Sequence, residues 1–181
     1  MSYYFSKIFS NLFGETDIRI PIFGLDAAGK TTMMYKLHIG EVVPSIPAIG
    51  MGVKTIKYRN ITFEVVDVGG CYTPRECYPI FFQGIKHGFI YVVDSTDRER
   101  ISEAAYWLKQ ALCRTELRDA PILVFANKQD LNRVMSLDEI TSKLDLNRIH
   151  SHKWHLQASS ARCGDGLLEG LQWLAANITT D

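Results

Sequence analysis

The sequence predicts an α/β protein with a mostly parallel β-sheet and helices on both of its faces. Residues 18–23, 89–93 and 122–126 are short, continuous apolar runs, which are typical of strands buried on both faces. Segments with a helical pattern separate these runs, so we expect the strands to pair in parallel through helical crossovers. In such sheets, ligands bind in the loops that follow the carboxyl ends of the strands.

Length and composition are those of one globular domain. The chain has 181 residues, of which 46% are hydrophobic and 22% charged, and these values exclude wholesale disorder. Lys and Arg number 20, as do Asp and Glu, and this balance argues against a protein that mainly binds nucleic acid. The four cysteines do not suggest a disulfide scaffold, and no apolar stretch approaches the ~18–20 residues needed to span a bilayer. We therefore expect a soluble, cytoplasmic domain that acts as a monomer.

The first half of the chain predicts a central strand, a helix and a hairpin. The first strand contains Pro21, which removes a ladder hydrogen bond from a strand expected to be central. We keep this strand because a specific loop motif follows it, and a helix is expected over residues 31–40. Residues 53–58 and 61–68 are two strand-like runs joined by Arg59-Asn60, which predicts a β-hairpin.

The second half predicts two helices that pack on the sheet. Residues 99–113 have a helical pattern between two of the apolar runs, and residues 167–178 form the last element. The last segment has the i, i+4, i+7 stripe of a helix with one buried face. The stripe consists of Leu167, Leu171, Leu174 and Ile178.

Residues 24–31 match the phosphate-loop pattern G-x-x-x-x-G-K-[ST] between an apolar strand and a helix. Glycines let the backbone turn so that N–H groups point at phosphate oxygens, and the helix N-terminus adds partial positive charge. We expect Lys30 to reach the β- and γ-phosphates and the Thr31 hydroxyl to ligate Mg²⁺. The alternative is a chance match in a glycine-containing turn, and the strand and helix on either side argue against it.

Asn127-Lys128-Gln129-Asp130 follows the apolar run 122–126 and predicts a guanine site. The Asp130 carboxylate can accept hydrogen bonds from the guanine N1–H and amino group, a pair that adenine does not offer, and an unpaired buried carboxylate is costly. A polar turn is the alternative, which the position after a strand and beyond a phosphate loop disfavours. Ser159-Ser160-Ala161 follows the last strand, where its backbone can meet the guanine carbonyl.

Asp67-Val68-Gly69-Gly70 stands at the end of the second hairpin strand. Asp67 offers a carboxylate for the Mg²⁺ shell, and Gly70 offers a backbone N–H near the γ-phosphate. A strand-end aspartate is sometimes only structural, but three such motifs in this order favour a nucleotide site.

Together these motifs resemble the ADP-ribosylation factor (Arf) family of small GTPases, and the similarity runs from end to end without large insertions. The resemblance implies the P-loop NTPase fold of small G proteins, with six strands, one antiparallel hairpin and five flanking helices. It also implies GTP or GDP and Mg²⁺ as cofactors, and a GDP/GTP switch in vesicle-mediated protein transport. The segments that carry it are 24–32, 67–70, 94–100, 125–131 and 164–174.

The resemblance assigns each motif residue a role. Thr31 and Asp67 are the expected Mg²⁺ ligands, and Gly70 with Cys71 occupies the catalytic position. Exchange factors, GTPase-activating proteins and effectors are expected to bind near residues 49–83. The expected nucleotide-binding residues are Gly24, Asp26, Ala27, Ala28, Gly29, Lys30, Thr31, Thr32, Asp67, Gly70, Asn127, Lys128, Asp130, Ser160 and Ala161.

Two residues depart from the family pattern in ways that affect hydrolysis. Ala48 stands where the first switch has a threonine, so the hydroxyl that ligates Mg²⁺ is missing, at a cost of about 1.5–3 kcal/mol. Cys71 stands where the second switch has the glutamine that orients the attacking water, and a thiol is a poorer hydrogen-bonding group. We expect GTP binding with slow hydrolysis. A nucleophilic or redox role for Cys71 is a further alternative.

The effector surface also departs from the family. Pro74 and Pro79 fall where relatives form a switch helix, which tolerates proline only in its first turn. The aromatic triad of the relatives corresponds here to Met51, Val66 and Phe81. Because few large side chains dominate an interface, we expect a partner that differs from the usual Arf effectors.

Residues 1–14 are expected to form an amphipathic helix ahead of a GTP-binding domain at 15–181. The family implies that this helix inserts into lipid with GTP bound, and permanent packing on the domain is the alternative. Ser2 replaces the glycine that relatives myristoylate, so membrane contact, on Golgi or other endomembranes, is expected to be weak or transient. The apolar face consists of Phe5, Ile8, Phe9, Leu12 and Phe13.

Two functions from different classes remain open after these motifs. The first is an Arf-like GTP switch, and the second is a pseudo-GTPase, an interaction module that holds nucleotide without meaningful turnover. Ala48 and Cys71 are the residues that separate the two hypotheses.

Overall fold

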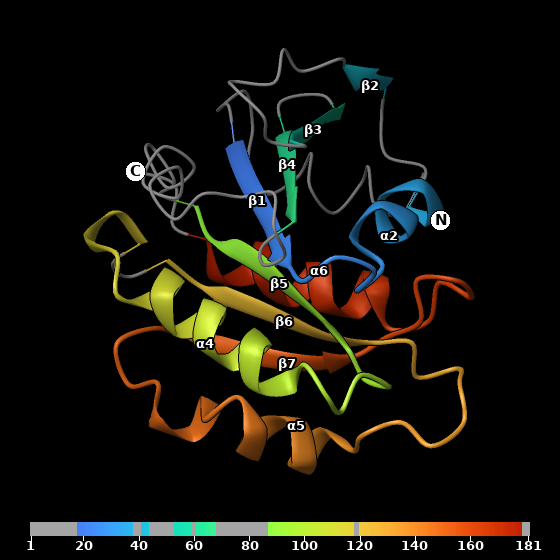
Figure 1. Cartoon of the computed structure of the whole chain (residues 1–181). Helices are drawn as coiled ribbons and strands as arrows, with labels where there is room; N and C mark the ends of the chain where they lie inside the picture. Colours follow the sequence, from blue (N-terminus) through green and yellow to red (C-terminus); the bar gives the residue numbers. More distant parts are fainter. Residues whose placement is uncertain are drawn as a thin grey trace.

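The computed structural model of the chain describes residues 18–37, 41–43, 53–58, 61–67, 87–117 and 120–178. In these segments the strands form one sheet in the order β2-β3-β4-β1-β5-β6-β7 (Figure 1). The strands are β1 (Ile18–Gly24), β2 (Glu41–Val43), β3 (Val53–Tyr58), β4 (Ile61–Asp67), β5 (Phe89–Asp94), β6 (Ile122–Asn127) and β7 (Trp154–Ala158). The α-helices are α2 (Lys30–Lys36), α4 (Ile101–Leu112), α5 (Leu137–Lys143) and α6 (Leu167–Asn177), and the short 3-10 turns are η2 (Thr115–Leu117) and η3 (Leu146–Arg148).

The strands β4, β1, β5, β6 and β7 run parallel to one another. The strand β3 pairs antiparallel with β4, and β2 pairs antiparallel with β3 at the edge of the sheet. The chain order reverses beside β1, which lies between β4 and β5. The loop after β1 therefore starts at the switch point of an α/β sheet, where ligands of such sheets bind.

The described residues form seven strands, whereas six are expected from the family resemblance. The additional strand is β2, whose three residues pair with the residues 55–57 of β3. Two valines favour an extended conformation there, but three residues are too few for a recognisable alternation of polar and apolar positions. The described part of the chain has four α-helices, where the resemblance implies five.

Pro21 lies inside a central strand, as the sequence indicates, and its place along the strand explains how a residue without a backbone N–H is accommodated there. It is aligned with Glu64 of β4, and the ladder between β1 and β5 starts one residue later, at Ile22↔Ile90. Pro21 therefore stands just outside the part of β1 that pairs with β5, which is compatible with its missing N–H.

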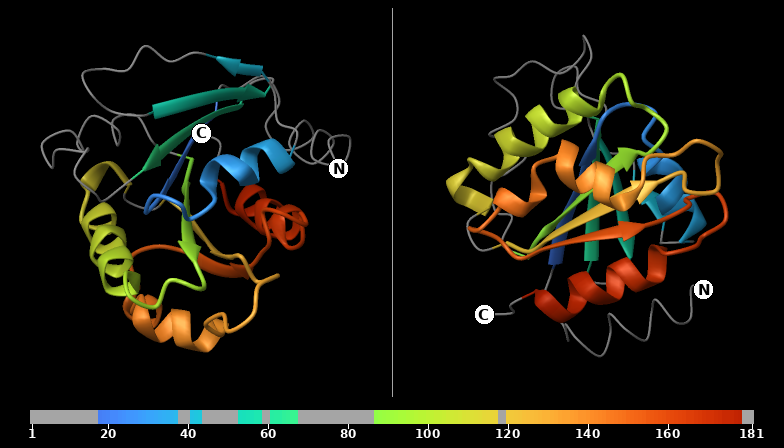
Figure 2. Two further views of the ribbon diagram at one scale, coloured as in Figure 1. Left: turned by 45° about the vertical axis from the view of Figure 1, so that its right-hand side comes forward. Right: turned by 90° about the horizontal axis from the view of Figure 1, so that it is seen from below.

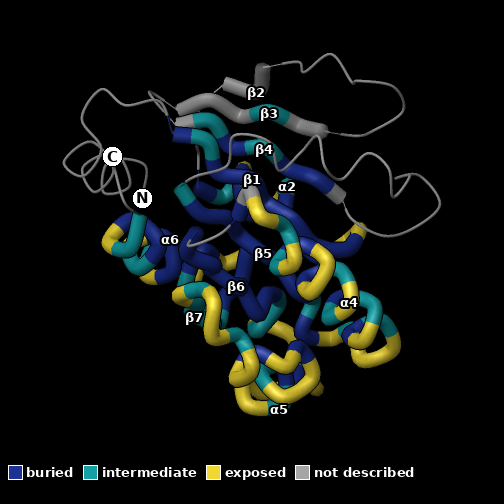
Figure 3. Tube along the Cα trace, turned by 90° about the vertical axis from the view of Figure 1, so that its left-hand side faces the viewer, coloured by how far each residue is buried: buried dark blue, intermediate teal, exposed yellow. Residues whose placement is uncertain are grey.

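Helices cover both faces of the sheet (Figure 2), and each face has its own apolar core. Helices α2 and α6 pack on one set of strand residues, which includes Ile22 and Phe125. Helices α4 and α5 pack on the set that includes Phe23 and Val124. Since successive strand residues point to opposite faces, neighbours along β1 and β6 belong to different cores. Strands β1, β5 and β6 are accordingly buried along almost their whole length, β7 is half-buried, and exposed positions lie on the outer helices and in the loops (Figure 3).

The apolar stripe of the last helix is confirmed. Leu167, Leu171 and Leu174 are buried in the core under α6, and Ile178 packs against that core just after the helix ends. Helix α4 likewise buries Ile101 and its apolar face, although it starts two residues later than expected. None of the helices in the described segments is long and apolar enough to cross a membrane.

Helix α5 has no counterpart in the sequence prediction, although its start has a clear local signal. Ser136 is its N-cap, and the Ser136 hydroxyl accepts a hydrogen bond of 3.1 Å from the Glu139 N–H. A serine followed three residues later by a glutamate is the pattern of a capping box. The helix is short and buries Ile140, so it offers little of the periodic pattern that identifies helices.

Candidate nucleotide-binding site

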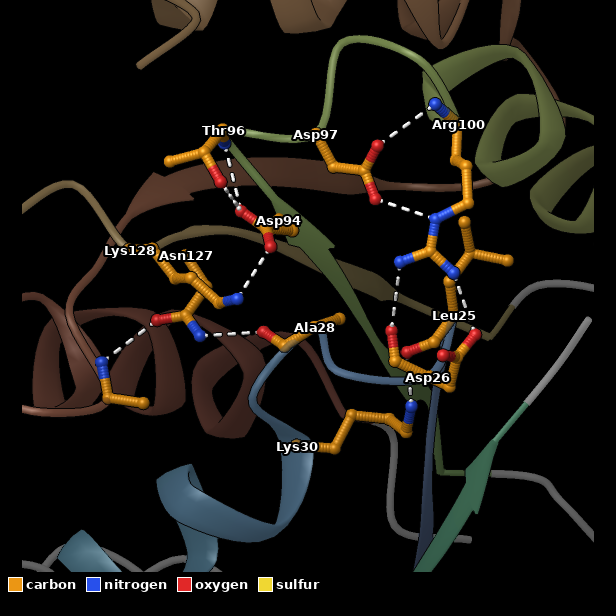
Figure 4. Close-up of polar contacts among 11 residues, drawn as sticks. Leu25, Asp26, Ala28, Lys30, Asp94, Thr96, Asp97, Arg100, Asn127 and Lys128 are labelled. Carbon is orange, nitrogen blue, oxygen red and sulfur yellow. Dashed lines mark hydrogen bonds and ion pairs between the residues drawn. The ribbon is translucent and has the colours of Figure 1, made fainter. Parts of the chain in front are cut away.

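The loop between β1 and α2 curls around the side chain of Lys30. This lysine is 2% exposed, and its Nζ donates hydrogen bonds of 2.7 Å to the carbonyls of both Gly24 and Leu25 (Figure 4). The loop thus holds a positive charge against its own backbone, on the side of the sheet where the parallel strands end. A buried ammonium in this place suits an anionic ligand.

Two glycines of the loop occupy backbone conformations that other residues rarely adopt. Gly24 has φ of +150°, and a Cβ on it would lie 2.2 Å from the carbonyl oxygen of Val92. Gly29 has φ of +97°, and a Cβ there would lie 2.3 Å from the side-chain nitrogen of Asn127. Both positions therefore need glycine for space as well as for conformation. The loop keeps its backbone close to β5 and β6 as a result.

Asn127 ties the phosphate loop to the loop that follows β7. It is 1% exposed, its Nδ2 donates to the Ala28 carbonyl at 2.8 Å, and its Oδ1 accepts from the Ala161 N–H at 2.8 Å. Both polar atoms of the amide are therefore used within the protein. The two loops that the sequence assigns to phosphate and to base are held together by this one side chain (Figure 4).

A pocket of about 150 Å³ opens beside the phosphate loop, between these two loops. The Ser160 hydroxyl donates to Oδ1 of Asp130 at 2.7 Å, which fixes the carboxylate at the pocket wall. A carboxylate has about four acceptor positions, so Asp130 keeps the capacity to accept from a ligand. The pocket is lined by Gly29, Thr32, Asn127, Lys128, Asp130, Leu131, Ala161 and Arg162.

Lys128 is held by an ion pair with the carboxylate of Asp94, at the end of β5. The distance from Nζ to Oδ2 is 2.5 Å, and Oδ1 of Asp94 accepts from the Thr96 N–H at 2.9 Å and from the Thr96 hydroxyl at 2.7 Å. Burial raises the pKa of Asp94, but the hydrogen bonds from Lys128 and Thr96 outweigh burial and leave the pKa below its usual value. Lys128 therefore contributes a fixed side chain to the pocket wall.

Arg100 links the start of α4 to the phosphate loop. Its Nη1 lies 2.8 Å from Oδ1 of Asp26, and its Nε lies 2.7 Å from Oδ2 of Asp97 (Figure 4). The hydrogen bond to Asp97 raises the pKa of Arg100, and the contact with Asp26 adds to this effect. Arg100 is thus a permanent cation at the outer edge of the loop.

The expected Mg²⁺ ligands lie on neighbouring elements. Thr31 is in the first turn of α2, directly after Lys30, and Asp67 is the last residue of β4, aligned with Gly24 of β1. The register thus brings the backbone of Asp67 to the beginning of the phosphate loop. The other residues expected in the switches, Ala48, Gly70 and Cys71, lie outside the described residues.

Sequence reasoning gave no individual role to Asp94, Asp97 or Arg100. The sequence offers two signals: Asp94 at the end of a strand, and Asp97 three residues before Arg100 at the start of a helix. Neither signal is specific, because the partners Lys128 and Asp26 lie 34 and 74 residues away along the chain.

The fold and this site define a P-loop nucleotide-binding protein: a phosphate-loop sequence follows β1 at the sheet's switch point, and a pocket with a fixed carboxylate adjoins it. The sequence profile of the ADP-ribosylation factor family matches residues 5–178. The chain therefore belongs to the ADP-ribosylation factor family and is a small GTP-binding protein.

Proposed function

We propose that this protein is a GDP/GTP switch that recruits effectors in vesicle-mediated transport, with slow intrinsic hydrolysis of GTP. The observation that carries the proposal is the pairing of a buried lysine inside the phosphate loop with a pocket that Asp130 lines. Lys30 and the loop amides bind the phosphates, and Asp130 accepts from the guanine edge. Asn127 keeps the two halves of the site in register.

Magnesium fits the donor set at the phosphate end of the site. A hydroxyl from Thr31 and a carboxylate from Asp67 are hard oxygen ligands, and Mg²⁺ usually takes one or two protein oxygens together with phosphate oxygens and water. The alignment of Asp67 with Gly24 supports this assignment, since it brings the end of β4 to the loop. When bound, the ion supplies positive charge to the terminal phosphates.

We expect slow hydrolysis because two side chains of the family pattern are replaced in the switches, the glutamine by Cys71 and the threonine by Ala48. Without the amide of a glutamine, Cys71 does not hold an attacking water as firmly, and without a hydroxyl, Ala48 does not complete the Mg²⁺ shell. The protein then stays in its GTP state until a GTPase-activating protein acts on it. An exchange factor loads GTP, and effectors bind near residues 49–83.

A pseudo-GTPase that holds nucleotide without turnover is the second candidate. Ala48 and Cys71 favour this candidate as well, because a protein that lacks the threonine hydroxyl and the glutamine amide can bind nucleotide and still fail to hydrolyse it. In that case the protein is an interaction module whose partner surface does not change with nucleotide.

In either case we place the protein in the cytoplasm, with transient contact to Golgi or other endomembranes through residues 1–14. The five apolar side chains of that segment favour lipid, while the single base before Gly14, Lys7, adds only about 1 kcal/mol toward anionic membranes. Co-sedimentation with liposomes should be stronger with a GTP analogue than with GDP. Strong binding that does not depend on nucleotide would contradict this placement.

The nucleotide that copurifies with the full chain tests the proposal. We expect mass spectrometry to find GDP or GTP, and single-turnover hydrolysis to be slow and to be accelerated by Cys71→Gln. The matched control is Cys113→Gln, at an exposed cysteine that caps the C-terminal end of α4, whereas Arg100 at the opposite end of this helix contacts the phosphate loop. Fast hydrolysis in the unmodified chain would reject the slow switch, and no turnover even with Cys71→Gln would favour the pseudo-GTPase.

A further inference from the structure

The guanidinium of Arg100 touches both the side chain and the backbone of Asp26 in the phosphate loop. The distance from Nη1 to Oδ1 of Asp26 is 2.8 Å, and Nη2 donates to the Asp26 carbonyl at 3.4 Å. Asp26 is 60% exposed and Arg100 is 37% exposed, so the contact lies at the mouth of the site. A planar guanidinium with two N–H groups suits a two-point contact of this kind.

Asp97 holds the guanidinium in this orientation. Its Oδ1 accepts from the backbone N–H of Arg100 at 3.0 Å, and its Oδ2 accepts from Nε at 2.7 Å. Both oxygens of Asp97 are thus used on Arg100, and the two terminal nitrogens are left facing the phosphate loop (Figure 4). The side chain is positioned by the start of α4 before any ligand arrives.

Asp26 stands near the terminal-phosphate end of the proposed site. Lys30 places its Nζ on the carbonyls of Gly24 and Leu25, the two residues that precede Asp26. Since the lysine of a phosphate loop reaches the β- and γ-phosphates, the carboxylate of Asp26 lies near the part of the ligand that distinguishes a triphosphate from a diphosphate. An uncompensated carboxylate there repels a γ-phosphate.

We propose that Arg100 is a positioning residue that neutralises Asp26 and restrains the phosphate loop, so that the site accepts the additional charge of a nucleoside triphosphate. This inference rests on the proposed function. Arg100 itself contacts the loop and not the nucleotide, and its effect reaches the ligand through Asp26. The residue that neutralises Asp26 thus stands at the start of α4, outside the phosphate-loop motif.

The test measures the affinities of the full chain for GTP and GDP by isothermal titration calorimetry with Mg²⁺. In Arg100→Gln we expect GTP affinity to fall about fivefold and GDP affinity to fall less than twofold, because an exposed ion pair contributes modestly. Higher salt should shrink this difference, since it screens the exposed charge of Asp26. The double variant Asp26→Asn with Arg100→Gln should restore the ratio of the two affinities.

If Arg100→Gln folds poorly, a second single variant, which should shift the ratio of GTP to GDP affinity in the opposite direction, tests the inference. Asp26→Asn alone removes the carboxylate and leaves the cation, so the ratio of GTP to GDP affinity should rise. The control is Arg148→Gln, which breaks an exposed ion pair with Asp145 at a distance from the loop and should leave both affinities unchanged.

A purely structural role for Arg100 predicts a different result. It would lower both affinities by the same factor, together with the melting temperature, and the double variant would not restore the ratio. That outcome, or an unchanged ratio in Asp26→Asn, overturns the inference while the proposed function stands. If the unmodified chain binds neither nucleotide, the proposed function fails and the inference fails with it.

Discussion

At the scale of single residues, the site depends on three polar side chains held by hydrogen bonds within the protein, of which Lys30 and Asn127 are buried and Asp130 is exposed. Asn127 uses both amide atoms, Lys30 uses two loop carbonyls, and Asp130 has one carboxylate oxygen fixed by Ser160. The polar atoms of Lys30 and Asn127 are costly to bury unless they are hydrogen-bonded, so the arrangement of these two side chains leaves few alternative conformations. The site is therefore organised in the protein itself.

Asp130→Asn should change which purine the pocket prefers. The amide keeps one acceptor but replaces the other with a donor, so we expect GDP affinity to fall about ten- to hundredfold. Xanthosine diphosphate, which has a carbonyl where guanine has an amino group, should bind relatively better. Competition between the two nucleotides measures this change.

Asp138→Asn, at an exposed position in the first turn of α5, is the matched control for the loss of one carboxylate. It should leave nucleotide preference as it is. An Asp130→Asn protein that binds GDP as tightly as the unmodified chain would show that Asp130 does not read the base.

Asp94 should make the stability of the protein depend on pH in acid. Its pKa in the folded protein is below the ordinary value of 3.8, so the unfolded chain binds more protons and stability rises with pH in this range. The stabilisation is complete above the ordinary pKa and is lost as the pH falls through the folded one. In Asp94→Asn, the free energy of unfolding should fall less steeply between about pH 5 and about pH 3.

Urea unfolding at several pH values measures this slope, with Asp145→Asn as the control, since the ion pair of Asp145 with Arg148 is exposed at both ends. At neutral pH, Asp94→Asn should also destabilise the protein by about 1–3 kcal/mol, because Lys128 loses a charged partner. Equal slopes in the unmodified chain and in Asp94→Asn would contradict the assignment.

At the scale of elements, helix α6 was predictable from its periodic stripe and strands β5 and β6 from their continuous apolar runs, whereas β2 and α5 carry neither signal. Helix α6 and the apolar strands β5 and β6 are buried on the faces that their patterns indicate. Strand β2 and helix α5, with three and seven residues, are too short to show a period. The phosphate loop and the Asn127–Asp130 segment stand out in the sequence because their chemistry requires particular residue types at fixed spacing, and their role in binding nucleotide stays a prediction.

The stripe of α6 gives a prediction about packing. Leu174 is 0% exposed and belongs to the core between α6 and the sheet, so Leu174→Ala should lower the free energy of unfolding by about 2–5 kcal/mol. Gln172→Ala, on the exposed side of the same helix, is the control and should change stability little. Denaturant unfolding compares the two, and equal effects would mean that α6 is packed in another register.

At the scale of the whole molecule, the sheet topology brings distant segments to one edge. The loops after β1, β6 and β7 form the pocket, and α4 reaches the same loop through Arg100. The contacts from Arg100 to Asp26 and from Lys128 to Asp94 span 74 and 34 residues of sequence, so no local pattern reveals them. The sequence motifs were sufficient to indicate the family and its ligand class, and the three-dimensional structure was needed to show the contacts of Arg100 and Lys128.

The central claim is that the loop around Lys30 and the pocket at Asp130 together bind a guanine nucleotide. Calorimetry of the full chain with Mg²⁺ and GDP, GTP or ADP tests it most directly. We predict binding of GDP and GTP at micromolar concentration or tighter, and much weaker binding of ADP. Equal affinity for ADP and GDP, or heat from none of the three, would contradict the claim.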